Sequence, residues 1–258
     1  MCYDRDARPP VPAVDTASVA VDELVLVSAD GTAFAAFRAD PARPDGAALV
    51  VLLDHRGLCP FYERLAVALA AHGHPAVVID YFGRTAGTDH RRNENFPAPS
   101  DLAGLTRDGM DADLLAAARH VRERGAESVV ALGFCLGGRL VFFASAPRYG
   151  LDGVIGFYGH PGTGGPYGPG PAQHASELSA PILGLFGGAD EAIPPDVVEQ
   201  FELALTAAGV PHTISSYPGA PHGFFDVRHD EHQATCESAW QLVQDFLRDR
   251  LTPERETT

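Results

Sequence analysis

The sequence predicts an α/β protein with a mostly parallel central sheet, helices on both faces and an antiparallel N-terminal hairpin. Short apolar runs such as "ALVVLLD" (48–54) and "SVVALGF" (128–134) alternate along the chain with longer segments of helical periodicity. Runs that are apolar on both sides are typical of parallel strands in a sheet whose two faces are covered. The third observation is a pair of alternating segments near the N-terminus.

These two segments are "ELVLVSADG" and "TAFAAFRA", which meet at an Asp-Gly turn. Alternation on both sides of such a turn predicts a β-hairpin. The residues before the hairpin are rich in Pro and Asp, and the rest of the chain has neither a repeat nor a linker. We therefore expect an N-terminal arm over residues 1–20 and a single domain over 21–258.

The remaining elements follow from the same alternation. Apolar runs predict strands at 48–54, 76–82, 128–134, 152–158, 181–187 and 212–218. Periodic segments predict helices over about 61–71 and 101–124, from about 136 onward, from "IPPD" to about 208, and over about 231–251.

Composition limits the function. The 258 residues carry a formal charge of −15, which argues against nucleic acid and anionic membranes as partners. No window approaches the ~20 apolar residues of a membrane span, and the charged N-terminus does not resemble a signal peptide. The four cysteines form no metal-ligand pattern. We expect a cytoplasmic monomer or homodimer that acts on a small molecule and needs neither metal nor cofactor.

The segment "GFCLG" (133–137) comes at the end of a predicted strand and fits the nucleophile-elbow pattern G-x-S-x-G with cysteine in place of serine. Gly133 and Gly137 leave room for the sharp turn, and the following helix would direct its positive dipole end at Cys135. Such an environment lowers a thiol pKa. Taken alone, the motif also fits a buried structural cysteine or a redox-sensitive thiol.

Two further residues favour catalysis. Asp190 in "FGGADEAIPP" and His222 in "YPGAPHGF" each follow a predicted strand. Ligands of open parallel sheets bind beyond the carboxyl ends of the strands, where these residues would lie together with Cys135. The chain order nucleophile, acid, histidine is that of the α/β hydrolases. We interpret Cys135, Asp190 and His222 as a catalytic triad.

The same residues carry a family likeness. From about residue 48 to 250 the chain resembles the dienelactone hydrolases, or carboxymethylenebutenolidases, which use a Cys-His-Asp triad on an α/β-hydrolase fold. The likeness rests on "DHRGL", "GHPAVVIDYFGR", "GFCLGG", "GGADEAIPP" and "PHGF", which occur in the expected order. It implies an α/β-hydrolase fold and hydrolysis of a small lactone or activated ester through a thioester.

The resemblance also implies individual roles. Cys135 would be the nucleophile, His222 the base and Asp190 its orienting acid. The backbone N–H groups of Leu136 and His55 would form the oxyanion hole. Arg84 in "DYFGR" matches an arginine that, in the family, contacts the substrate carboxylate.

The chain departs from the family pattern at two positions. Asp54 stands where the family has a glutamate that helps to generate the thiolate, so Asp54 is a candidate for thiol activation, with His222 alone as the alternative. Asp226 stands where the family often has a second arginine for the substrate carboxylate, and Arg228 is a candidate substitute. The substrate is therefore expected to differ from an anionic dienelactone.

Other residues are candidates for the pocket wall. The Gly- and Pro-rich loop 159–174 is either a plain surface loop or a cover that brings Tyr158, His160 or Tyr167 to a ligand. Phe224, beside the histidine, suggests an apolar wall or core packing. Cys59 lacks the elbow motif and is interpreted as a bystander.

Two other functions fit the same fold, since a fold does not fix a function. One is a biosynthetic enzyme that catalyses cyclisation, acyl transfer or epoxide opening. The other is a ligand-binding protein without catalysis.

Overall fold

The computed structural model describes residues 8–89, 96, 99–164, 168–225 and 229–250. Its strands form one eight-stranded sheet in the order β1-β2-β4-β3-β5-β6-β7-β8. The strands are β1 (Ala20–Val27), β2 (Ala33–Asp40), β3 (Ala48–Leu52), β4 (Ala76–Asp80), β5 (Val129–Phe134), β6 (Gly153–Phe157), β7 (Ile182–Gly187) and β8 (His212–Tyr217). The pairs from β4 through β8 are parallel, whereas β1–β2 and β2–β4 are antiparallel. The predicted sheet and hairpin are confirmed.

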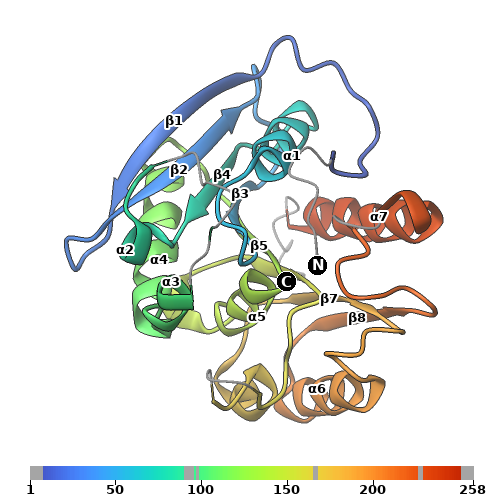
Figure 1. Ribbon diagram of the computed structural model, residues 1–258. Helices are drawn as coiled ribbons and strands as arrows, with labels where there is room; N and C mark the ends of the chain where they lie inside the picture. Colours follow the sequence, from blue (N-terminus) through green and yellow to red (C-terminus); the bar gives the residue numbers. More distant parts are fainter. Residues whose placement is uncertain (1–7, 90–95, 97–98, 165–167, 226–228, 251–258) are drawn as a thin grey trace, which may run out of the picture.

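Helices cover both faces of this sheet (Figure 1). Helices α1 and α7 lie on one face, and α4, α5 and α6 lie on the other. The α-helices are α1 (Pro60–Ala71), α2 (Gly83–Ala86), α3 (Pro99–Ala103), α4 (Arg107–Glu123), α5 (Leu136–Phe143), α6 (Pro195–Ala208) and α7 (Gln233–Asp249). Short 3-10 turns occur at η1 (Pro147–Tyr149), η3 (Pro171–Glu177) and η4 (His229–Glu231).

The single helix expected over 101–124 was wrong, because this region holds α3 and α4. Thr106 has extended backbone angles, and its hydroxyl accepts a hydrogen bond from the backbone N–H of Gly109 at 3.2 Å. A threonine in this N-cap position satisfies one of the N–H groups that a helix start leaves without a partner. Because Thr106 caps this turn, a new helix begins after it.

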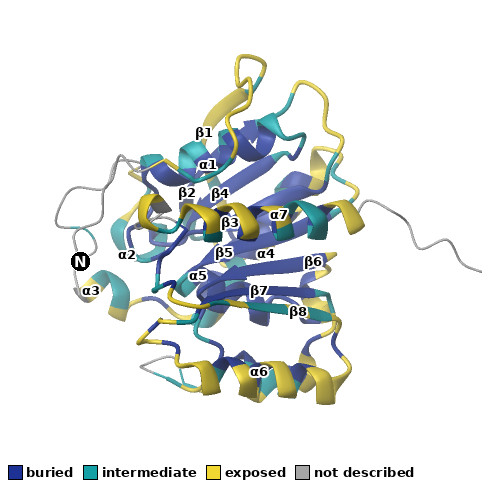
Figure 2. Ribbon diagram, turned by 90° about the vertical axis from the view of Figure 1, so that its right-hand side faces the viewer, coloured by how far each residue is buried: buried dark blue, intermediate teal, exposed yellow. Residues whose placement is uncertain are grey.

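Burial follows the layers (Figure 2). Every residue of β3, β4, β5, β6 and β7 is buried, as expected for parallel strands covered on both sides. The edge strand β1 is mostly exposed. No helix in the described part of the chain combines the length and the apolar character that crossing a bilayer requires.

Candidate active site

A sharp turn joins β5 to α5 and holds Cys135. Its backbone has φ +52° and ψ −109°, which is strained for a residue with a side chain. A Cβ at Gly133 would lie 2.2 Å from the carbonyl oxygen of Gly137, and a Cβ at Gly137 would lie 2.3 Å from that of Leu52. Both positions therefore require glycine, as the elbow motif predicts. The turn presents Cys135 at the first turn of α5.

Asp190 and His222 meet beside this turn. The Nδ1 atom of His222 lies 2.7 Å from Oδ2 of Asp190. The other carboxylate oxygen, Oδ1, accepts hydrogen bonds from the backbone N–H groups of Ala192 and Ile193, at 2.9 and 3.2 Å. Asp190 is almost fully buried, at 4% exposure. These contacts fix the carboxylate, which in turn fixes the orientation of the imidazole.

The hydrogen bonds in this cluster shift its pKa values. Burial by itself would raise the pKa of the Cys135 thiol, but hydrogen bonds from His222 and His55 outweigh burial and lower it. Burial would lower the pKa of His222, but its hydrogen bonds with Asp190 and Cys135 raise it to about 10. Both shifts favour the charged forms, the thiolate of Cys135 and the imidazolium of His222.

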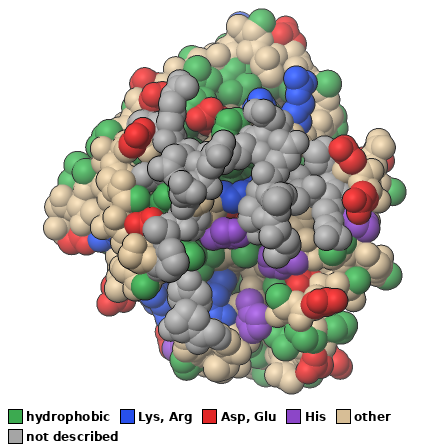
Figure 3. Space-filling model, in the orientation of Figure 1, with side chains coloured by type: hydrophobic (Ala, Val, Ile, Leu, Met, Phe, Trp, Pro, Cys, Tyr) green, Lys and Arg blue, Asp and Glu red, His purple; other side chains and the backbone are tan. Residues whose placement is uncertain are grey.

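A cavity of about 1100 Å³ opens over Cys135, Asp190 and His222. Figure 3 shows histidine side chains gathered near the centre of this face. The cavity is lined by His55, Leu102, Cys135, Leu136, Arg139, Tyr158, His160, Gly164, Ala189, Asp190, Glu191, Ala192, Ile193, Gly219, Pro221, His222 and His232. A cavity of this size accommodates a small organic molecule.

The two residues expected in the oxyanion hole, Leu136 and His55, both line the cavity. Leu136 is the first residue of α5, so its backbone N–H has no acceptor four residues back within the helix. His55 follows β3, and its imidazole hydrogen-bonds with Cys135. That side-chain contact was not predicted, because sequence spacing gives no information on which way a loop imidazole points.

The carboxylate of Asp54 is bound by Arg56. Its carboxylate accepts hydrogen bonds from the backbone N–H of Arg56 at 2.8 Å and from the Nε of Arg56 at 2.8 and 3.0 Å, and Nη2 lies 2.5 Å away. Both side chains are buried, at 4% and 7% exposure. The guanidinium of Arg56 also lies 5.5 Å from the ring centres of Phe61 and Tyr62. Asp54 is thus held by Arg56 and does not line the cavity.

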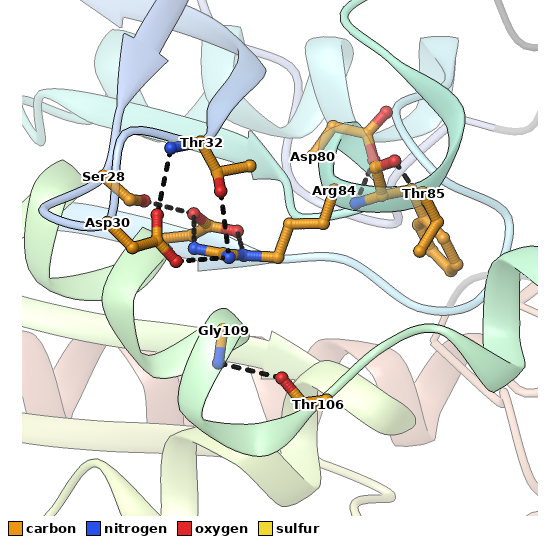
Figure 4. A network of polar contacts seen from close by, with 10 residues as sticks. Ser28, Asp30, Thr32, Asp80, Arg84, Thr85, Thr106 and Gly109 are labelled. Atoms are coloured by element: carbon orange, nitrogen blue, oxygen red, sulfur yellow. Dashed lines mark hydrogen bonds and ion pairs between the residues drawn. The ribbon is translucent and has the colours of Figure 1, made fainter.

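Arg84 lies outside the cavity lining, in a polar network that Figure 4 shows. Its Nε and Nη2 each donate to Asp113 at 2.8 Å, and its Nη1 donates to Asp30 at 2.7 Å. The buried carboxylate of Asp113 also accepts from the hydroxyl of Ser28. The structure therefore places Arg84 in a link between α2, α4 and the β1–β2 turn.

Only some of the other residues predicted to form the pocket wall line the cavity. Tyr158, with φ +38°, lines the cavity, and its ring centre lies 5.0 Å from that of His222. His160 also lines it, with its Nδ1 buried and without a hydrogen-bond partner. Phe224 is fully buried and packs against Tyr158 and Tyr217 behind the cavity. Tyr167, Asp226 and Arg228 lie outside the described residues.

The sequence analysis did not identify Arg139, which holds the loop after β6. Its Nη1 donates to the carbonyl oxygens of His160 and Gly162, both at 2.7 Å. Its Nη2 donates to those of Gly168 and Pro169, at 3.1 and 3.3 Å. Arg139 is 5% exposed. An arginine within the apolar helix "LGGRLVFF" was the available signal, because a buried guanidinium needs several acceptors.

The second cysteine near the site differs from Cys135. Cys59 is buried, does not line the cavity, and burial raises its pKa to about 11. In the described ranges, no group of three or more His, Cys, Asp or Glu side chains is placed to hold a metal ion.

Comparisons with known proteins agree with this fold. A "Putative carboxymethylenebutenolidase" of Salmonella typhimurium is 31% identical, over 87% of this chain and 86% of its own length. The carboxymethylenebutenolidase of Rhodococcus opacus is 29% identical, over 98% of each chain. A solved thermophilic esterase of Thermogutta terrifontis shares the fold, with a TM-score of 0.68, 19% identity and coverage of 93% and 98%.

The sequence profile described as "Dienelactone hydrolase family" matches residues 34–251. This match covers most of the chain. The family supports the assignment of the chain as a carboxylic ester or lactone hydrolase. The chain belongs to the dienelactone hydrolase family of α/β hydrolases, as its elbow motif and strand order led us to expect.

Proposed function

We propose that this protein hydrolyses a small activated ester or enol lactone through a Cys135–His222–Asp190 triad. The observation that carries the proposal is the 2.7 Å contact between His222 and Asp190. The same imidazole hydrogen-bonds with Cys135 at the start of α5. This order of contacts supports the roles of nucleophile, base and orienting acid in a covalent hydrolase.

In the first half-reaction the Cys135 thiolate attacks the carbonyl carbon and forms a C–S bond. The charge moves to the carbonyl oxygen, which accepts hydrogen bonds from the backbone N–H groups of Leu136 and His55. As the tetrahedral intermediate collapses, the C–O bond to the leaving group breaks, and His222 gives its proton to that oxygen. A thioester and a neutral imidazole remain.

In the second half-reaction neutral His222 takes a proton from water, which attacks the thioester carbonyl. The C–S bond breaks and expels the Cys135 thiolate, which restores the thiolate–imidazolium pair. The carboxylic acid product then loses its proton to solvent. Because thiolates attack readily but a thioester needs a positioned water, activated substrates should be favoured over plain alkyl esters.

We infer further that the preferred substrate is uncharged. The name of the family's relatives denotes a lactone that bears a carboxyl group. Among the described residues that line the cavity, Arg139 is the single arginine or lysine, and its guanidinium donates to four backbone carbonyls. Asp190 and Glu191 lie on the same wall. A negatively charged substrate would therefore meet carboxylates, which is unfavourable in a cavity of low dielectric constant.

The test is a kinetic panel of aryl esters and enol lactones, each as a neutral compound and as a carboxylate-bearing analogue. We expect turnover of the neutral members, and a loss of about 10³-fold or more in kcat for Cys135→Ser and His222→Gln. Cys59→Ala is the matched control and should keep its activity. No turnover on the whole panel would contradict the hydrolase proposal and favour a ligand-binding role. A preference for carboxylates would contradict the inferred neutral substrate.

A further inference from the structure

The thiol of Cys135 lines the same cavity as two imidazoles, and hydrogen bonds with both lower its pKa. His222 approaches from the loop after β8, and His55 approaches from the loop after β3. Both histidines line the cavity. A single base is sufficient to deprotonate a cysteine, so the second imidazole needs a separate explanation.

We propose that the side chain of His55 is a further catalytic residue, which holds the Cys135 sulfur as a thiolate and stabilises it as a leaving group. This role rests on the proposed hydrolytic function and is distinct from the oxyanion contact of the His55 backbone. It also replaces the thiol-activating role for which Asp54 was the candidate.

The contacts of Asp54 exclude it from taking the thiol proton directly. Its carboxylate faces Arg56, which binds it through the backbone N–H, Nε and Nη2. The negative charge nevertheless acts on both partners of the Cys135–His55 contact. Asp54 raises the pKa of His55 and opposes ionisation of Cys135.

Several described groups act on the pKa of His55. Its hydrogen bond with Cys135 is the largest influence and raises its pKa, whereas burial lowers it. Asp54 raises this pKa further and Arg56 lowers it. The net result is a raised pKa, which favours the charged imidazolium, and a charged N–H is a stronger hydrogen-bond donor to sulfur than a neutral one.

The protons balance without a new co-reactant. The single thiol proton goes to His222, whose pKa is about 10, and His55 donates an N–H to the resulting thiolate without losing its proton. Attack on the substrate removes the charge from sulfur and so removes the partner of that N–H. When water later cleaves the thioester, the returning thiolate regains the His55 hydrogen bond. His55 therefore lowers the energy of the resting thiolate and of its departure.

The test measures the thiol itself. The rate of Cys135 alkylation by iodoacetamide is followed against pH in a Cys59→Ala background, with the labelled cysteine identified by peptide mass spectrometry. His55→Leu removes the donor but keeps the backbone N–H of the oxyanion hole. His55→Gln restores a neutral donor. His232→Leu is the matched control, since it removes another histidine of the cavity that does not hydrogen-bond with Cys135.

We expect His55→Leu to raise the Cys135 pKa, so that alkylation at about pH 6 slows by ~10-fold or more. His55→Gln should recover part of this loss, and His232→Leu should match the wild type. In hydrolysis, the loss of kcat/KM in His55→Leu should shrink as the pH rises from about 6 to about 9, because the thiol then ionises unaided. A merely structural role would give a loss that does not depend on pH.

An unchanged alkylation profile in a folded His55→Leu protein would overturn the inference, and so would an equal shift in His232→Leu. If His55→Leu does not fold, the same comparison is made with His55→Gln, where an unchanged profile together with unchanged hydrolysis would overturn it. The alkylation readout needs no turnover. A protein that hydrolyses nothing yet shows the His55-dependent shift would contradict the proposed function alone.

Discussion

At the residue scale, the proposed chemistry depends on hydrogen bonds that outweigh the effect of burial on the pKa values of Cys135 and His222. Burial disfavours both the thiolate of Cys135 and the imidazolium of His222, yet the contacts between them and with Asp190 reverse both effects. The sequence was sufficient to predict that these three residues lie together, since each belongs to a local motif that follows a strand. It was not sufficient to predict the partners of Asp54, because the ion pair with Arg56 is set by how the loop packs over Phe61 and Tyr62.

The substitution Asp190→Asn should change how activity depends on pH. In the proposed mechanism His222 must stay protonated to pair with the thiolate and to protonate the leaving group, so we expect activity to fall as the pH rises through its pKa of about 10. Removing the Asp190 charge takes away a contact that raises this pKa. The descending limb of the kcat/KM profile should therefore move to lower pH, with a loss of kcat of about 10²- to 10⁴-fold. A limb at the wild-type position, measured on a neutral aryl ester, would contradict the role of Asp190.

At the element scale, the first residues of α5 organise the site. Its first turn faces Cys135, while Arg139, one turn later, fixes the loop that follows β6. The helix could be predicted from "GFCLGG", but the loop could not, because the Gly- and Pro-rich segment 159–174 has no periodicity. Four carbonyls of its described residues accept hydrogen bonds from Arg139, which lies 21 to 30 positions earlier in the chain. The division of 101–124 into α3 and α4 was missed for a related reason, since a threonine cap is a weak signal within a long periodic segment.

The substitution Arg139→Met should weaken both substrate binding and the stability of the fold. The variant loses four hydrogen bonds to loop carbonyls, including that of His160, so the cavity wall should loosen. We expect KM for a neutral ester to rise ~10-fold, with a smaller change in kcat, and the free energy of unfolding to fall by about 1–3 kcal/mol. Arg139→Lys, which reaches fewer carbonyls, should be intermediate. Steady-state kinetics and chemical denaturation test this, and an unchanged KM would contradict it.

At the scale of the whole molecule, the antiparallel hairpin is tied to α2 and α4 by an ion network in which Asp113 is fully buried. Arg84 joins α2 to Asp113 of α4 and to Asp30 of the β1–β2 turn (Figure 4). The mostly parallel sheet follows from the alternation of strands and helices, and the N-terminal hairpin follows from its Asp-Gly turn; both were predicted. The network was not, because it pairs residues 29 and 54 positions apart in the chain.

Arg84→Met tests this structural role. It leaves the fully buried Asp113 carboxyl without its cationic partner, which should lower the free energy of unfolding by about 3 kcal/mol. Turnover of a neutral ester at 25 °C should stay within about twofold, because Arg84 does not line the cavity. Unchanged stability together with a large loss of kcat/KM would instead assign Arg84 to substrate binding, as the family likeness implied.

The central claim is that Cys135 carries the acyl group during turnover. An activated aryl ester is mixed with the enzyme, the reaction is quenched in acid within a single turnover, and the protein is digested for mass spectrometry. The proposed mechanism predicts a burst of aryl alcohol and the mass of the acyl group on the Cys135 peptide, with neither in Cys135→Ala. A burst equal to the enzyme concentration without acyl-Cys135, or an undiminished burst in Cys135→Ala, would contradict it.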